Sequence, residues 1–141
     1  MQDFRKLSVW TKSHQLVLLI YAATGNVSER KFPGLTSQLR RAAASIPANI
    51  AEGCGHTGSK ELARFLGIAA ASSFELAYHL QLAVDLEVIS KSDFARLDAR
   101  TVQVKRMLGS LLSKVRQSAS RREQKGAPKL PASALTRTED H

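Results

Sequence analysis

The sequence predicts an all-α protein, an antiparallel up-and-down four-helix bundle. Apolar residues recur at alternating spacings of three and four in four separate segments, the period that keeps one face of a helix inward. The sequence shows no run in which apolar and polar residues alternate one by one, the period of a strand. The connections between the segments are short, and short connections favour antiparallel neighbours. A chain of 141 residues is long enough to bury a core as one domain.

The first helix is expected from about Ser8 to Thr24, with Ser8 as N-cap and Gly25 as the C-terminal stop. Its inward face is expected to be the stripe Trp10, His14, Val17, Tyr21 and Thr24. A second apolar stripe lies roughly 100° away, and Leu19 falls nearly opposite the core; the second stripe consists of Val9, Leu16 and Ile20. No helix of a four-helix bundle is central, so we expect another subunit to cover this extra apolar surface.

The second helix is expected from about Leu35 to Glu52, after Pro33-Gly34. Its inward face is formed by Leu39, Ala42, Ile46, Asn49 and Gly53. Pro47 lies at the centre of this helix, where it has no N–H to donate and crowds the carbonyl of Ala43. An interior proline costs about 3 kcal/mol relative to alanine. We therefore expect a kink near Pro47, with the Asn49 side chain bonded to the carbonyl that the proline frees.

The third and fourth helices show the heptad spacing most clearly. The third is expected from about Ser59 to Ile89, with Leu62, Leu66, Ala69, Ser73, Leu76, Leu80 and Ala83 inward. The fourth begins at Ser92 or Asp93, with Phe94, Leu97, Thr101, Val104, Leu108, Leu111 and Val115 inward. Beyond Arg121 the pattern is broken by glycine, prolines and scattered charges. We expect a bundle over residues 1–120 and a disordered basic tail over residues 121–141.

The chain is strongly basic, with 21 Lys+Arg against 12 Asp+Glu, a net charge of +9 and a pI near 10.2. Such an excess favours acidic partners, RNA or DNA first, although ordinary solubility is the alternative reading. Bases flank the inward face of the fourth helix on both sides, which suits contact with phosphates and not readout of base sequence. Aromatic residues make up only 6% and mostly occupy inward positions, so stacking platforms for single strands are not evident. The candidate nucleic-acid contacts are Arg96, Arg100, Lys105, Arg106, Lys114 and Arg116, with Lys60 and Arg64 at the start of the third helix.

The sequence offers little support for an enzyme. Residues 53–60 resemble a P-loop, but Ser59 precedes Lys60, and a helix stands where a strand is needed. Glu75 and His79 have a spacing that can hold a metal, but no second such motif accompanies them. Cys54 lies between glycines, where a lone thiol is a candidate for reactivity, but no catalytic motif surrounds it. We expect no catalytic site, no metal and no cofactor.

The first residues lack the apolar run that a signal peptide would show, and the longest apolar run, Leu16 to Ala23, is too short to cross a bilayer. A cytoplasmic protein with no membrane partner is therefore expected.

Self-association is expected from surfaces that the bundle itself does not use. On the second helix, small residues between two charged ones form an outer stripe of Arg41, Ser45, Ala48 and Glu52. Glu75 either pairs with Arg40 or Arg41, within or between subunits, or is a solvated glutamate. The candidate residues of a subunit interface or structural motif are Leu16, Leu19, Ile20, Arg41, Ser45, Pro47, Asn49 and Glu52.

The stretches Gln38-Leu39-Arg40-Arg41-Ala42 and Ser45-Ile46-Pro47-Ala48-Asn49-Ile50-Ala51-Glu52-Gly53 resemble the signature of a known family. That family comprises the small four-helix-bundle proteins encoded in intervening sequences of bacterial ribosomal-RNA genes. The likeness covers about Phe4 to Ile89 and includes Leu7-Ser8-Val9-Trp10 and Arg64-Phe65-Leu66-Gly67-Ile68-Ala69, with Ser72, Glu75 and Leu76.

The resemblance implies a bundle that assembles as a homopentamer, with no established enzymatic activity. A related group serves as accessory proteins of diversity-generating retroelements, which implies a reverse transcriptase and nucleic acid as partners of a basic surface. This chain departs from the pattern at Ala70, Ala71 and His56, where arginine, glycine and arginine are expected. The lost bases weaken any transfer of a nucleic-acid site to that end of the third helix.

The favoured function is therefore a non-enzymatic homo-oligomer that binds nucleic acid or a ribonucleoprotein without sequence specificity. The alternative is a structural or protein-interaction module with no nucleic-acid role.

Overall fold

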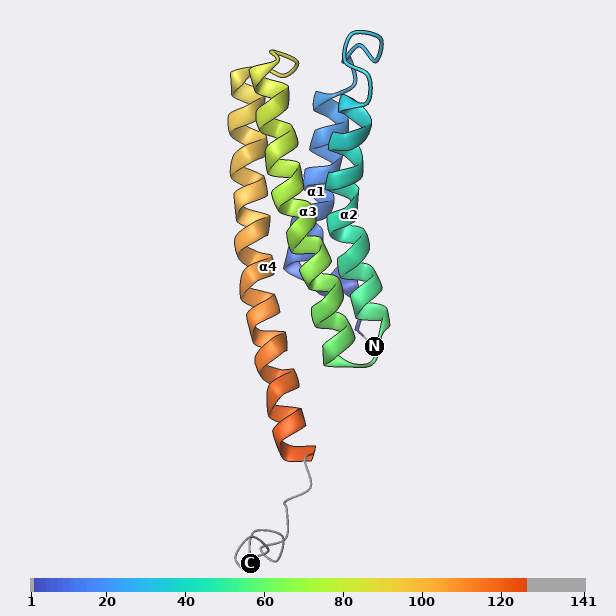
Figure 1. Cartoon of the computed structure of the whole chain (residues 1–141), viewed down its shortest axis with the longest axis vertical. Coiled ribbons are helices and arrows are strands. Elements are labelled where there is room, and N and C mark those ends of the chain that lie inside the picture. Colours follow the sequence, from blue (N-terminus) through green and yellow to red (C-terminus); the bar gives the residue numbers. More distant parts are fainter. Residues whose placement is uncertain (1, 127–141) are drawn as a thin grey trace, which may run out of the picture.

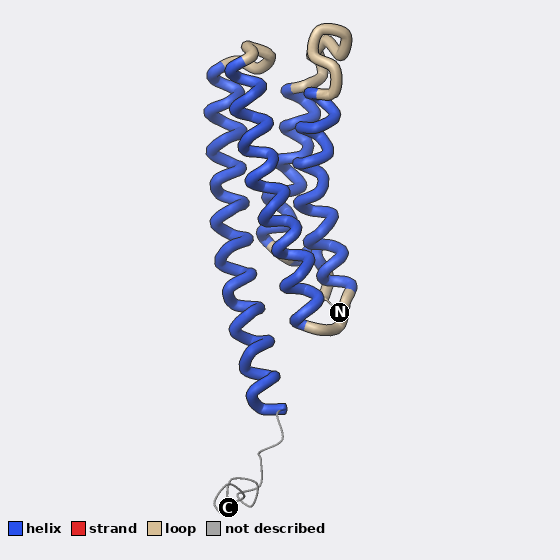
Figure 2. Tube along the Cα trace, in the orientation of Figure 1, coloured by secondary structure: helices blue, strands red, loops and turns tan. Residues whose placement is uncertain are grey.

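The computed structural model describes residues 2–126, which form a short 3-10 helix and four α-helices (Figure 1). The 3-10 helix η1 spans Phe4–Lys6, and the α-helices are α1 (Ser8–Ala23), α2 (Leu35–Gly55), α3 (Ser59–Asp85) and α4 (Lys91–Gly126). Within residues 2–126 there is no strand (Figure 2). The prediction of an all-α, four-helix protein is confirmed.

The four helices surround one core, each in contact with the helices before and after it, and α1 also in contact with α4. In Figure 1 the chain turns back at each of the three connections between helices. The core is aliphatic and includes Leu39, Ile46, Leu66, Leu76 and Leu108, all fully buried. Small buried residues on α2 and α3 (Ala42, Ala43, Ala69 and Ala83) accompany these larger side chains.

The prediction of which residues form the inward face of α1 is wrong. The buried residues of α1 are Val9, Ser13, Leu16 and Ile20, whereas His14 and Tyr21 are exposed. Ser13 lies in the middle of the buried stripe, and its hydroxyl donates to the carbonyl of Trp10 at 2.9 Å. Of the expected stripe, Thr24 is buried, and Trp10 and Val17 are half-buried against the core. Because a serine interrupts the apolar pattern of the buried stripe, the sequence favours the neighbouring stripe, which has the same spacing.

The helix boundaries differ from the expected ones at several ends. Ser8 is the first residue of α1, and the N-cap is Leu7, which makes no side-chain bond. α3 ends at Asp85 instead of Ile89, and Glu87 just beyond it has a left-handed φ of 60°. α4 begins at Lys91, where the Ser90 hydroxyl accepts from the backbone N–H of Asp93 at 3.0 Å and thereby caps the helix.

The fourth helix is also longer than expected. It continues to Gly126, so residues 121–126 are helical and do not belong to a disordered tail. No glycine or proline interrupts the chain between Gly109 and Gly126, which leaves the helix nothing to stop it. The rest of the expected tail, residues 127–141, lies outside the described residues.

Pro47 is buried inside α2, which continues as one helix to Gly55. A kink at Pro47 remains a prediction. Across residues 2–126, no helix combines the length and the apolar character needed to cross a membrane.

Candidate functional site

A small polar network joins α2 to α3 at the motif. The hydroxyl of Ser45 on α2 lies 2.8 Å from the hydroxyl of Ser72 on α3. The side-chain amide of Asn49 donates to the Ser45 carbonyl at 2.7 Å and lies 3.0 Å from the Ser45 hydroxyl. Ser72 is buried and the other two are half-buried, so both hydroxyls and the Asn49 side-chain NH₂ have partners where water is largely excluded. The network gives these three residues a structural role between the two helices.

From the sequence, the Asn49 side chain is expected to bond the carbonyl that Pro47 frees, and this expectation is wrong. That carbonyl belongs to Ala43, whereas the amide of Asn49 bonds Ser45. The reason is reach, because Ser45 lies four residues before Asn49, one turn back along the helix, whereas Ala43 lies six residues before it. Gly53 ends the motif in close contact with α3, because a Cβ there would lie 3.0 Å from Leu62 Cδ1 and Phe65 Cβ.

An ion-pair cluster lies just outside this network. The Arg41 guanidinium contacts Glu75 Oε1, and it also donates to the Gln38 side chain at 2.9 Å. Glu75 Oε1 lies 3.4 Å from His79 Nε2, while the other ring nitrogen of His79 is buried without a partner among the described residues. The structure thus places Glu75 in a pair with Arg41 within the chain. Arg40 points instead to α1, with its Nε 3.1 Å from the Thr24 hydroxyl.

Two of the residues expected at subunit contacts are core residues. Leu16 and Ile20 are 0% exposed within the single chain, so a second subunit cannot reach them. Leu19 is half-buried and packs against the core. Glu52 is exposed and makes no ion pair within residues 2–126, beside a shallow hollow lined by Ala48, Ala51, Gly55 and His56.

The basic residues expected to contact nucleic acid do not form one patch. Arg96, Arg106, Lys114 and Arg116 are exposed on α4, whereas Arg100 and Lys105 are half-buried. Arg96 lies 3.3 Å from Asp93, and the Lys105 ammonium lies 4.7 Å from the centre of the Phe74 ring. Lys60 and Arg64 are exposed near the start of α3, where Arg64 lies 3.4 Å from Glu61.

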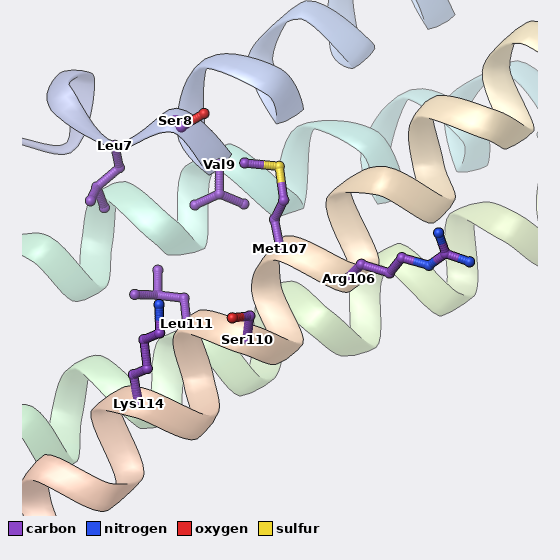
Figure 3. Close-up of a pocket in the computed structure, with 8 residues that line it drawn as sticks. All are labelled: Leu7, Ser8, Val9, Arg106, Met107, Ser110, Leu111 and Lys114. Carbon is purple, nitrogen blue, oxygen red and sulfur yellow. The ribbon is translucent and has the colours of Figure 1, made fainter.

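Arg106 and Lys114 both line a groove between the start of α1 and the middle of α4, with a volume of about 470 Å³. Figure 3 shows Met107 and Val9 pointing toward one another across it, with Lys114 extending beside Leu111 and Arg106 extending away. Leu7 completes the apolar lining. The groove therefore combines apolar walls with a cationic rim, which sequence spacing on α4 alone does not reveal.

Arg122 was missed by the sequence reasoning, which placed it in the tail. Its guanidinium donates to the Ser59 hydroxyl at 3.3 Å, which brings α4 to the start of α3 beside Lys60. The signal was present in the sequence, because residues 117–125 contain no helix breaker.

Cys54 lies in the last turns of α2, not in a loop, and is 1% exposed. Burial raises the pKa of its thiol, which reduces the thiolate fraction and disfavours the reactive role considered above. Among residues 2–126 there is no group of three His, Cys, Asp or Glu side chains that could hold a metal ion.

From the sequence, most aromatic residues are expected at inward positions, but besides Tyr21 two aromatic residues of α3 are exposed. Phe74 and Tyr78 on α3 are 65% and 63% exposed. They fall outside the inward heptad of α3, so their exposure was readable from the sequence.

Comparisons with known proteins agree with this geometry. The sequence model described as "23S rRNA-intervening sequence protein" matches residues 5–110, which include the motif and most of the bundle. A crystal structure of a protein with unknown function from the S23 ribosomal protein family of Bacteroides thetaiotaomicron superposes with a TM-score of 0.67 at 25% identity. That match covers 74% of this chain and 97% of the other. No curated protein matches the chain.

Proposed function

This chain belongs to the 23S rRNA-intervening sequence protein family, and we propose that it is a non-enzymatic homo-oligomer that binds nucleic acid through α4. The function of the structural relative is itself unknown. The proposal therefore depends on the charge distribution of this chain.

The observation that carries it is the separation of charge between the two halves of the bundle. α1 and α4 together carry eleven basic and three acidic residues, whereas α2 and α3 carry four of each. The excess positive charge of the helices thus belongs to one pair of neighbouring helices. Basic side chains on such a surface neutralise phosphates and release the cations condensed on RNA or DNA, which favours binding at low salt.

The bases of α4 lie on both sides of its buried stripe, and the two on the rim of the groove are mixed with apolar side chains. This spread suits contacts with a phosphate backbone at several angles and provides no array for reading base edges. We therefore expect affinity to fall steeply with salt and to vary little with sequence.

The test is a salt titration with a labelled RNA or DNA duplex, comparing the wild type with Arg106→Ala plus Lys114→Ala. Both side chains are exposed, so the double variant should fold, and the slope of log affinity against log salt should fall by about 2. Arg100 is a poorer choice because it is half-buried.

The matched control is Arg30→Ala plus Lys31→Ala, which removes the same charge from exposed residues in the connection between α1 and α2. An unchanged slope in the control supports α4 as the binding surface. No binding at low salt, or equal loss in both variants, would contradict the proposal.

Self-association is the second part of the proposal. The exposed outer face of α2, with Arg41, Ala48 and Glu52, supports it, since small residues permit close approach of another helix. Five subunits, and a reverse transcriptase as partner, are suggested by the family resemblance alone. Light scattering tests the assembly: a 15.4 kDa particle at micromolar concentration would contradict it.

A structural or protein-interaction module is the second candidate function. The groove between α1 and α4 favours it, because its apolar walls suit a side chain better than a phosphate. Absence of nucleic-acid binding, together with an intact fold, would leave this candidate in place.

A further inference from the structure

The second half of α4 presents an uncharged polar stripe to solvent. The stripe begins just after Leu112, the last buried residue of α4. Its members recur at spacings of four, three and four, and all are exposed: Ser113, Gln117, Ser120 and Gln124. The apolar residues of this part, Val115 and Ala119, are half-buried and lie on another side of the helix. A helix face with no apolar residue is unsuited to packing against another helix and suits a polar partner.

Basic residues flank this stripe on both sides. Arg116 lies on one side, and Lys114 and Arg121 lie on the other, each roughly 70–90° around the helix from the stripe at 100° per residue. All three are exposed, and none makes an ion pair within residues 2–126. Two positive flanks with an uncharged strip between them match a groove whose two edges are rows of phosphates.

The charge of this part of α4 is of one sign over a long distance. Between Asp98 and Glu123 the helix has no acidic residue and seven basic ones: Arg100, Lys105, Arg106, Lys114, Arg116, Arg121 and Arg122. Such a run is complementary to a polyanion, whereas a protein partner would present charges of both signs. Charge complementarity therefore indicates nucleic acid as the occupant of this face.

The end of α4 is also accessible to a large partner. It projects beyond the loop between α2 and α3, and residues 121–126 are all exposed (Figure 1). The contact of Arg122 with Ser59 is made on the side of α4 roughly opposite the stripe, at 100° per residue, so it holds the helix end while leaving the stripe open.

The dimensions of a helix favour one kind of duplex. An α-helix with its side chains is about 10–12 Å across. The major groove of B-form DNA is about 12 Å wide and admits a helix, whereas the major groove of an RNA duplex is deep and narrow. Serines on the stripe are small, which lets the helix approach the floor of a groove.

We propose that the projecting half of α4 lies in the major groove of duplex DNA, with the serine–glutamine stripe toward the floor and the flanking bases on the phosphates of the two strands. This inference rests on the proposed binding of nucleic acid through α4 and deepens it by naming the duplex and the groove. Arginine to guanine, the commonest specific contact to a base edge, is missing from the stripe, so the sequence preference remains weak.

The choice of duplex is tested by comparing labelled DNA and RNA duplexes of the same sequence at one low salt concentration. Fluorescence anisotropy should show at least about tenfold tighter binding of DNA, since only its major groove accepts the helix. Methyl green, a dye that occupies the major groove, should be displaced from DNA by the protein, whereas a minor-groove dye should remain bound.

The position of the stripe is tested by Ser113→Glu plus Gln117→Glu. Two carboxylates on this face would lie among phosphates, so DNA affinity should fall at least about tenfold. The matched control is Thr11→Glu plus Gln15→Glu, which places the same charges at the same spacing on exposed residues of α1 and should have a much smaller effect. Circular dichroism and thermal unfolding of both variants report whether the bundle is intact.

Three outcomes would overturn the inference: equal affinity for DNA and RNA duplexes, equal losses in the two glutamate variants, or no displacement of methyl green. Binding of both duplexes that depends on Arg106 and Lys114 but not on the stripe would overturn the groove contact and leave the proposed function standing. No binding of either duplex at low salt would overturn both.

Discussion

The α2–α3 half of the bundle and the α1–α4 half are built differently. α2 and α3 meet through small residues, a serine–serine hydrogen bond and the Arg41–Glu75 ion pair, and their charges balance. Between α1 and α4, within residues 2–126, no side-chain hydrogen bond or ion pair is formed, and an open groove lies between the start of α1 and the middle of α4. Side-chain polar contacts therefore join the two helices of the α2–α3 half, whereas the excess charge lies in the α1–α4 half.

This difference separates structural from binding roles. The residues of the motif bond one another, so their identity is explained by the contact between α2 and α3. The bases of α4 have few partners within the chain, so their charge remains directed to solvent and to what binds there. Variants in the two halves should accordingly change different measurements.

The largest effect that tests this comparison is expected at Leu16. Leu16→Ala removes a fully buried side chain and should lower the free energy of unfolding by about 2–5 kcal/mol, measured by urea denaturation. Leu18→Ala, two residues along the same helix and 57% exposed, should change it by less than about 0.5 kcal/mol. Equal effects would mean that the buried stripe of α1 has been assigned to the wrong residues.

A smaller effect is expected at Gly53, where α2 packs tightly against α3. A methyl group there would meet Leu62 and Phe65 at 3.0 Å, whereas at Gly55 it would meet nothing within 4 Å. Gly53→Ala should therefore be about 1–3 kcal/mol less stable than Gly55→Ala, because overpacking opposes the gain in helix propensity that both share. Thermal and urea unfolding of the two variants measure the difference directly, and equal stabilities would contradict close packing at this end.

The hydrogen bond between Ser45 and Ser72 gives a further test of the difference between the two halves. In a double-mutant cycle, Ser45→Ala and Ser72→Ala should show a coupling energy of about 1 kcal/mol, since their hydroxyls bond across α2 and α3. The matched pair in the other half is Ser13 and Thr101, which bond only carbonyls of their own helices. That pair should couple by less than about 0.5 kcal/mol, and a larger value would remove the distinction between the halves.

The smallest effect is expected at the Arg41–Glu75 pair. The two side chains are 58% and 37% exposed, so water screens their attraction. A cycle of Arg41→Ala and Glu75→Ala should give about 0.2–1 kcal/mol, decreasing as salt is added. A coupling that resists high salt would instead indicate that the pair is covered, as it would be at a subunit contact.

The inward faces of α2, α3 and α4 were predictable because each helix is distinctly two-sided. Leu39 and Ile46, Leu66 and Leu76, and Leu97 and Leu108 are buried as their spacing indicates. α1 was not predictable in the same way: it is apolar on several sides, and Ser13 occupies a core position. Which stripe is buried there depends on packing against α2 and α4, which spacing within one helix does not specify.

The candidate surfaces were predictable to a lesser degree. The bases of α4 could be identified from the sequence, but the pairing of Met107 with Val9 depends on how α1 and α4 are aligned. The bond of Asn49 to Ser45, instead of to the carbonyl freed by Pro47, depends on the direction of a side chain. The contact of Arg122 with Ser59 requires knowing that α4 extends past the bundle.

That extension has an evolutionary consequence. The last turns of α4 project beyond the loop between α2 and α3 (Figure 1), and every residue from Arg121 to Gly126 is exposed. The family match ends at residue 110, before this part begins. Substitutions there change the surface charge without disturbing the buried core. Selection can therefore adjust the charge of this end of α4 in small steps, while the residues that the fold requires lie in the bundle.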